Sequence, residues 1–168
     1  AGIAPDLLTC GKGLTAGCLP MSAVLAREDI YAAFLGTPAS GRTFFHGHSY
    51  TANPLAAAAA IANLDLLAET DTIAHAAAVG ESIGAHLADL GPDDGVLEVR
   101  RIGTMTGIEV AAVGERTGFE ICQEARRNGV WVRPLGDVIV LMPPLMIGEA
   151  DLALLTGTVR NAIRTVLG

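Results

Sequence analysis

Lys12 has the clearest potential for covalent chemistry in this sequence. It is the only lysine of the chain, and Gly11 and Gly13 flank it at the end of a short apolar run. Leu7, Leu8 and Cys10 in this run predict a short buried strand. Glycine lets the backbone turn sharply or come close to a bound group. Burial disfavours the charged form of lysine, so an amine in an apolar pocket can act as a Schiff-base nucleophile near neutral pH. A solvated loop lysine is the alternative, and residue type alone favours it.

A phosphate-binding P-loop does not fit the same stretch. That motif needs a glycine several residues before its Gly-Lys pair and a serine or threonine directly after it. Here Pro5 and Asp6 stand where the first glycine belongs, and Gly13 follows the lysine. We therefore exclude a P-loop.

A second polar stretch, residues 43–54, leads into a helix. Asn53 is suited to cap that helix, and Pro54 to stand in its first turn. Hydroxyl and N–H groups just before a helix suit an anion such as phosphate. Ser49 and Thr51 are the hydroxyl residues in question, and capping of the local turn is the commoner role for such residues.

His46 and His48 could be read as metal ligands, because only Gly47 separates them. They lie outside any expected helix and have no cysteine close by. Zinc sites usually combine more ligands at defined spacings. We expect no metal site in this chain.

Composition restricts the possible partners. The chain has 168 residues, half of them apolar, and a net charge of −7, which argues against nucleic acid or an anionic membrane as the main partner. Its three widely spaced cysteines suggest neither a disulfide framework nor a zinc site. The first residues lack the basic start of a signal peptide, and no stretch suits a bilayer span. We expect a cytoplasmic location.

Hydrophobic periodicity predicts the elements that position these residues. The first seventy or so residues resemble the tail of an α/β domain, and the rest resemble a small α+β domain with four short strands. We expect strands over 7–10, 19–26, 96–103, 106–111, 130–133 and 138–142, and helices over 27–35, 54–68, 71–90, 115–128 and 149–167.

The motifs together resemble the class III pyridoxal-phosphate aminotransferases, which have PLP fold type I. The resemblance covers essentially the whole chain, in the right order. It is carried by residues 5–17 (PDLLTCGKGLTAG), 45–56 (FHGHSYTANPLA), 132–137 (VRPLGD) and 141–144 (LMPP). It implies that residues 1–70 form the C-terminal part of the large PLP-binding domain with an interdomain helix. Residues 71–168 would then form the small C-terminal α+β domain.

The resemblance also implies roles for individual residues. Lys12 matches the lysine that forms the Schiff base with pyridoxal 5'-phosphate and then moves a proton as general acid and base. Ser49 stands where the family usually has a phosphate-binding threonine, contributed across a homodimer interface, and His48 lies beside it in the cofactor site. Gly47 and Arg133 would contact the substrate, and Arg133 would bind its carboxylate.

The RPLG…PP pattern narrows the resemblance toward the branch that acts in biotin biosynthesis. Such enzymes transfer an amino group to 8-amino-7-oxononanoate, giving 7,8-diaminononanoate, with S-adenosylmethionine or lysine as donor. Other class III ω-aminotransferases, acting on ornithine, acetylornithine, β-alanine or amines, and a non-catalytic homologue of the same fold are the alternatives. Family members are longer and carry further cofactor-binding groups upstream, so we expect the isolated chain to be inactive.

Overall fold

The computed structural model describes residues 2–168. It divides into two compact units, one ending at Thr70 and the other spanning Asp71–Gly168. Each unit is described by itself.

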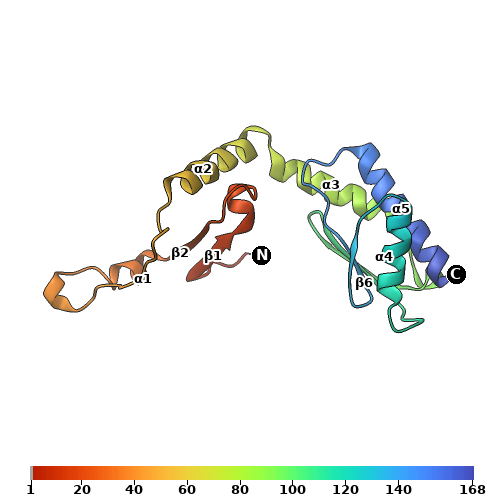
Figure 1. The fold of residues 1–168 in the computed structure, drawn as a ribbon, viewed down its shortest axis with the longest axis horizontal. Helices are drawn as coiled ribbons and strands as arrows, with labels where there is room; N and C mark the ends of the chain where they lie inside the picture. Colours follow the sequence, from red (N-terminus) through yellow and green to blue (C-terminus); the bar gives the residue numbers. More distant parts are fainter. Residues whose placement is uncertain (1) are drawn as a thin grey trace. The chain divides into compact units, whose positions relative to one another are not determined.

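The first unit is built around a two-stranded antiparallel sheet (Figure 1). Strands β1 (Leu7–Gly11) and β2 (Ser22–Ala26) pair from Leu7 opposite Ala26 to Gly11 opposite Ser22. The other elements of the unit are η1 (Lys12–Thr15), α1 (Glu28–Ala32), η2 (Pro38–Ser40) and α2 (Pro54–Glu69).

The prediction that the strand before Lys12 is buried was wrong. Leu7 is 57% exposed and Leu8 is 50% exposed, because no other layer of the described first unit covers the two-stranded sheet. The second strand begins at Ser22 rather than at residue 19. Pro20, which has no N–H to donate to a sheet ladder, lies just before it.

Helix α2 begins as predicted. The side-chain oxygen of Asn53 accepts hydrogen bonds from the N–H groups of Leu55 and Ala56, at 2.9 and 3.2 Å. One face of the helix contacts η1. Ala56 and Ala60 are buried, and Asn63 follows them at the spacing of a single helix face. Small side chains therefore let α2 approach the turn that begins at Lys12.

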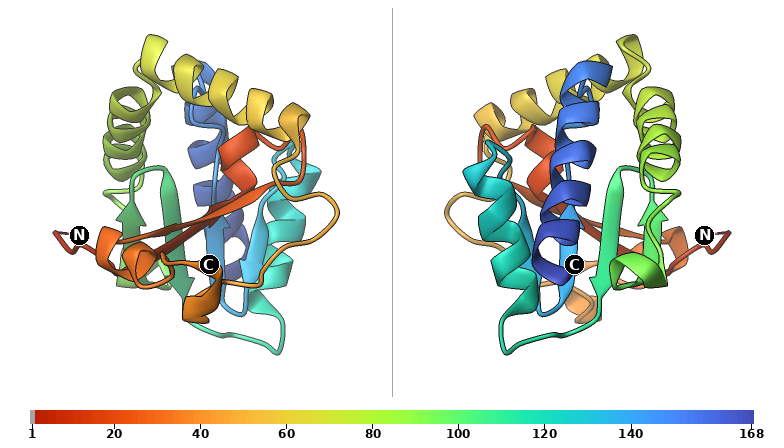
Figure 2. Two further views of the ribbon diagram at one scale, coloured as in Figure 1. Left: turned by 90° about the vertical axis from the view of Figure 1, so that its left-hand side faces the viewer. Right: turned by 90° about the vertical axis from the view of Figure 1, so that its right-hand side faces the viewer.

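The second unit is a four-stranded antiparallel sheet in the order β3-β4-β6-β5. Three helices lie against one face of it (Figure 2). The elements are α3 (Thr72–His86), η3 (Pro92–Asp94), β3 (Val96–Ile102), β4 (Met105–Val110), α4 (Thr117–Arg127), β5 (Arg133–Leu135), β6 (Val138–Leu141) and α5 (Glu149–Leu167).

Alternation along the strands separates the two faces of this sheet. Ile108 and Val110 on β4, with Ile139 and Leu141 on β6, are buried in the core beneath the helices. Residues at the alternate positions, such as Val140, lie on the other face, because successive side chains of a strand point to opposite sides. The second unit therefore has one covered and one open sheet face.

In the second unit, the largest differences from the predicted boundaries occur at two elements, β5 and α3. Residues 130–132 do not belong to a strand. The N–H of Val130 instead donates to Ala125 O at the end of α4, and Gly129 has the positive φ of +85° that such a helix ending favours. Helix α3 ends at His86, well before residue 90, because the chain tightens into a turn in which Leu90 N–H donates to Leu87 O.

Candidate active site

Lys12 sits at the junction of β1 and η1 in an unusual backbone conformation. Gly11 before it is extended, whereas Lys12 has φ of +51°, in the left-handed region. A non-glycine residue held there costs on the order of 1–3 kcal/mol and persists only where its surroundings impose it. Ala16, Ala52 and Asp71 also have a positive φ, but only Lys12 among these four carries an amine that could react.

Hydrogen bonds from two side chains hold the turn after Lys12. The buried Thr15 donates from Oγ1 to Leu19 O at 2.6 Å. Asn63 reaches across from α2 and donates from Nδ2 to Gly13 O at 2.9 Å and to Leu14 O at 3.2 Å. The turn is thus fixed by a tertiary contact as well as by its own backbone.

The Lys12 side chain itself is exposed and has no ion pair or hydrogen bond within residues 2–168. The apolar pocket expected to desolvate its amine is therefore not supplied by its own unit. The amine is free of any carboxylate, which leaves its nitrogen available to a ligand carbonyl.

In the turn at residues 48–51, the hydroxyl groups of Ser49 and Thr51 have different surroundings, which the sequence alone did not distinguish. Thr51 Oγ1 accepts the N–H of His48 at 3.0 Å, and Thr51 N–H donates to His48 O at 3.0 Å. Thr51 is the residue that caps the turn. Ser49 is exposed, and its hydroxyl has no partner in the described part of the chain. Ser49 is therefore free to donate to an anion.

His48 is oriented by the same turn. Its Nδ1 accepts the N–H of Tyr50 at 3.1 Å, so in the neutral ring Nε2 carries the proton and can act as a donor. The ring of His46 instead stacks on Phe44, with ring centres 5.4 Å apart. Gly47 between them is exposed, and a side chain there would meet no atom within 4 Å.

Arg133 belongs to the second unit, at the start of β5. It pairs in register with Val140, which places both on the sheet face away from the helices. It lines a hollow of about 430 Å³ together with apolar residues that include Trp131, Val140 and Met142. Met142 is 60% exposed there.

Arg133 is also set apart by having no partner in residues 2–168. Every other arginine of the chain contacts a carboxylate, a carbonyl or an aromatic ring. An exposed guanidinium without a carboxylate, set in an apolar hollow, suits the carboxylate of a ligand with an aliphatic chain.

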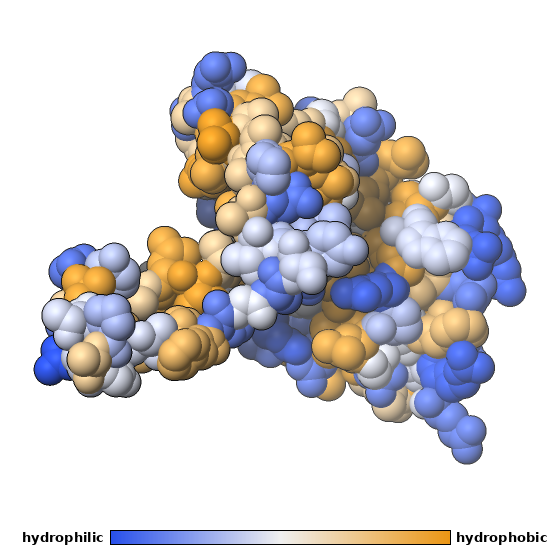
Figure 3. All heavy atoms as spheres, turned by 60° about the vertical axis from the view of Figure 1, so that its left-hand side comes forward, coloured by the Kyte–Doolittle hydropathy of each residue, from blue (hydrophilic) through white to orange (hydrophobic). Residues whose placement is uncertain are grey.

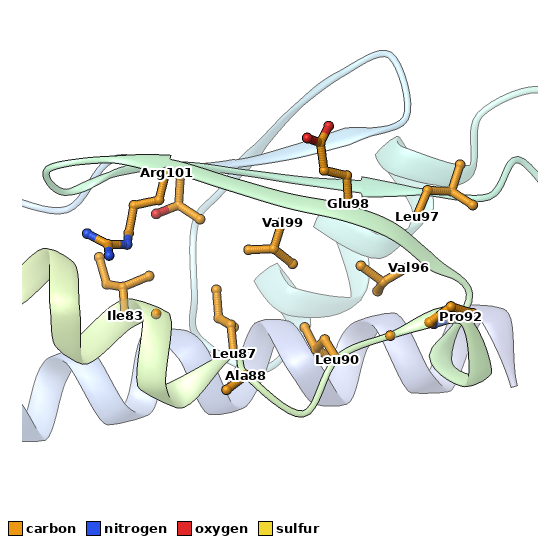
Figure 4. A pocket seen from close by; sticks show the side chains of 13 residues that line it. Ile83, Leu87, Ala88, Leu90, Pro92, Val96, Leu97, Glu98, Val99 and Arg101 are labelled. Atoms are coloured by element: carbon orange, nitrogen blue, oxygen red, sulfur yellow. The ribbon is translucent and has the colours of Figure 1, made fainter. Parts of the chain in front are cut away.

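A larger hollow of about 520 Å³ lies elsewhere in the second unit, between the end of α3 and β3. Apolar side chains such as Leu87, Leu90 and Val96 line it (Figure 4). Its guanidinium, Arg101, donates to Glu81 at 2.9 Å and is already paired. This hollow contains none of the residues singled out for chemistry.

The described sites fall into two groups. Lys12 and the Gly47–Ser49 segment belong to the first unit, and α2 joins them, since Asn53 caps the helix next to that segment and Asn63 holds η1. Arg133 belongs to the second unit. Sequence reasoning missed Asn63, because a polar residue in an alanine-rich helix gives no local sign of a partner 50 positions away.

The model of the aminotransferase class III family matches residues 1–163. The chain belongs to this family. It is 48% identical, over 98% of its length, to an adenosylmethionine-8-amino-7-oxononanoate aminotransferase of Nitratidesulfovibrio vulgaris, and 32% identical, over 98%, to an omega-aminotransferase of Caulobacter vibrioides. It covers 32% and 38% of these two relatives, so it spans about a third of their length.

Solved structures show the fold. The crystal structure of adenosylmethionine-8-amino-7-oxononanoate aminotransferase from Methanocaldococcus jannaschii matches 97% of the chain, with a TM-score of 0.85 and 32% identity, and the chain covers 39% of it. The predicted class, α/β with PLP fold type I, is confirmed. Within the described residues, no helix is both long and apolar enough to cross a membrane.

The reactive and hydrogen-bonding groups of this class III chain suit the aldehyde and the phosphate of pyridoxal phosphate. An unpaired amine at Lys12 is the group that an aldehyde requires. The hydroxyl of Ser49 and the Nε2–H of His48 are donors of the kind that a phosphate accepts. No group of three or more metal-ligating side chains gathers in residues 2–168.

Proposed function

We propose that this class III chain is part of a pyridoxal-phosphate-dependent aminotransferase that converts 8-amino-7-oxononanoate to 7,8-diaminononanoate in biotin biosynthesis. The observation that carries the proposal is Lys12, an unpaired amine in a left-handed conformation at the end of β1. The relative from N. vulgaris, 48% identical, bears the name of that activity.

Lys12 would perform the acid–base work. Pyridoxal phosphate, when bound, supplies an electron sink that makes the proton on the amine-bearing substrate carbon removable. The Nζ of Lys12 would first hold the cofactor covalently. Once released by the incoming amine, the same Nζ would take that proton and return it to a neighbouring carbon.

The remaining residues would bind rather than react. Ser49 Oγ and His48 Nε2 would donate hydrogen bonds to the cofactor phosphate, and the open space at Gly47 would admit the substrate. Arg133 would pair with the terminal carboxylate of the acceptor, while the apolar wall around it, including Val140 and Met142, would contact the aliphatic chain.

A homodimer with shared active sites forms part of the proposal, with Ser49 serving the neighbouring subunit's cofactor. Apolar groups lie at the surface in several places (Figure 3). In the first unit, Phe45 is 93% exposed and Tyr50 is 78% exposed, on either side of Ser49. Large exposed apolar groups of this kind are typical of surfaces that a partner covers.

A second candidate is another class III ω-aminotransferase. The similarity to the C. vibrioides omega-aminotransferase, at 32% identity over nearly the whole chain, supports it. Arg133 would serve any substrate that carries a carboxylate, so its presence does not discriminate. The identity of 48% to the relative from N. vulgaris favours the biotin-pathway substrate.

Borohydride reduction of the complete protein loaded with pyridoxal phosphate, followed by peptide mass mapping, tests the family chemistry. We expect a pyridoxyl adduct on Lys12, and a folded protein without that adduct would favour the non-catalytic homologue.

A panel of substrates then distinguishes the two candidate functions. Turnover of 8-amino-7-oxononanoate without turnover of ornithine supports the biotin pathway, whereas the reverse supports the ω-aminotransferase.

A further inference from the structure

Asn63 connects helix α2 to the turn that begins at the reactive lysine. Its Nδ2 lies 2.9 Å from Gly13 O and 3.2 Å from Leu14 O, the carbonyls of the two residues that follow Lys12. Because Nδ2 carries two hydrogens, it can donate to both carbonyls at once. A single carboxamide therefore fixes two consecutive peptide groups next to Lys12.

The backbone around Lys12 needs such support. Lys12 and Ala16, one at each end of η1, both have φ of +51°, a region that residues with a Cβ rarely adopt. Gly13 O also accepts the N–H of Ala16 at 3.2 Å, so Asn63 and the turn's own backbone share this carbonyl. The hydrogen bonds from α2 favour this conformation over relaxed alternatives.

We infer that Asn63 is a positioning residue, which orients the Lys12 amine by holding the backbone of η1. The role given to the Lys12 amine rests on the proposed function. The hydrogen bonds by which Asn63 holds η1 do not depend on the cofactor. Helix α2 also begins at the cap that follows the Ser49 segment. The same rigid helix therefore sets both the lysine turn and the end of the segment expected to contact phosphate.

The test compares three variants in the complete protein. Asn63→Ala removes the donor and raises the helix propensity of α2, so the helix itself is retained. Asn63→Asp keeps the shape of the side chain but has no N–H to donate at neutral pH. Asp65→Asn, an exposed position on α2 without a hydrogen bond in the described part of the chain, is the matched control.

The first readout is hydrogen exchange in the cofactor-free protein. The amides of Ala16 and Cys18 are hydrogen-bonded within the turn, to Gly13 O and Thr15 O. We expect both to exchange about tenfold faster in Asn63→Ala and Asn63→Asp, the effect of losing roughly one hydrogen bond. The control should exchange like the wild type. Unchanged exchange in both Asn63 variants would overturn the inference.

The second readout is the loaded protein. We expect the rate of covalent attachment of pyridoxal phosphate to Lys12, followed by visible absorbance, to fall about tenfold, and kcat with it, while KM for the acceptor stays within twofold. Faster exchange with attachment rate and kcat unchanged would assign Asn63 a merely structural role and reject positioning. A wild-type protein that forms no adduct on Lys12 would reject the proposed function. The hydrogen-exchange rates would still show whether Asn63 stabilises the backbone of η1.

Discussion

Arg164 donates a hydrogen bond from Nε to Oδ1 of Asp94 at 2.7 Å, joining the last turn of α5 to the η3 turn before β3. Arg164 also donates to Asp89 at 3.2 Å, and Arg160 donates to the same carboxylate. The hydrogen bond from Arg164 is the main reason that the pKa of Asp94 lies below its usual value of 3.8. The charged form of Asp94 is thus favoured in the folded unit.

This shift predicts an acid-dependent loss of stability. A carboxyl group whose pKa is lower in the folded state stabilises the fold above its unfolded pKa, and that stabilisation disappears as pH falls through the folded value. Asp94→Asn should lower the thermal midpoint at pH 6, and its difference from wild type should narrow as pH falls below about 3.8. Thermal unfolding followed from pH 6 to pH 3 measures this. Asp93→Asn, at an exposed neighbour, should show no such narrowing, and a constant gap for Asp94→Asn would contradict the prediction.

Two glycines of α3 provide a second, matched prediction. A Cβ at Gly80 would lie 2.4 Å from Gly103 O, a backbone atom with little freedom to move. A Cβ at Gly84 would meet only the flexible guanidinium of Arg101, at 3.4 Å and beyond. Gly80→Ala should therefore destabilise the protein by about 1–3 kcal/mol. Gly84→Ala should be neutral or stabilising by up to about 1 kcal/mol, because alanine favours helix. Urea unfolding measures both, and equal effects would contradict the packing argument.

The fold could largely be anticipated from periodicity. The helix over 149–167 was predicted to its last residue, because a long amphipathic pattern with no internal breaker defines both ends. The strand near residue 130 was misplaced, since its apolar run suits a strand as well as it suits the end of α4 packing into the core. Short apolar runs do not distinguish these cases without tertiary contacts.

The sequence identified the candidate residues of the site by their types, but it did not predict their surroundings. A lone lysine between glycines points to Lys12, but the turn that follows it accepts hydrogen bonds from Asn63, a residue of α2 that lies 50 positions after Gly13. Buried surroundings were expected at Leu7 and Leu8, and both proved exposed because their burial depends on atoms outside a two-stranded sheet. Local sequence indicates which groups can react, while long-range contacts set their geometry.

Replacing Ser49 and replacing Thr51 should affect different properties of the protein, the first cofactor binding and the second stability. Ser49 is free, whereas Thr51 accepts the N–H of His48 at 3.0 Å. In the complete protein, Ser49→Ala should weaken pyridoxal phosphate binding by about tenfold with little change in the thermal midpoint of the apo form, as expected for one lost hydrogen bond to a charged group. Thr51→Val should lower the apo midpoint, because it removes the cap of the turn. Cofactor titration and apo unfolding separate the two. A Ser49→Ala variant that binds the cofactor normally would remove Ser49 from the phosphate site.

Arg133 should determine how tightly the acceptor binds. Its guanidinium has no partner within residues 2–168 and lies in an apolar hollow, so a substrate carboxylate would be its first charged contact. Replacing it with Met keeps the side chain's apolar length and removes a charge-assisted hydrogen bond of about 1.5–3 kcal/mol. KM for the acceptor should therefore rise about 10- to 150-fold.

Two further variants make the Arg133 prediction specific. Arg133→Lys keeps the charge but loses the planar fork that binds a carboxylate through two hydrogen bonds, so it should recover only part of the affinity. Arg127→Met, at an exposed arginine paired with Glu124, is the matched control and should leave KM unchanged. Steady-state kinetics with the acceptor varied, and with an amino donor that lacks a carboxylate held saturating, isolates the effect. A KM that is unchanged in Arg133→Met would show that the acceptor carboxylate binds elsewhere, and the open face of the β3-β4-β6-β5 sheet would then lose its assigned role.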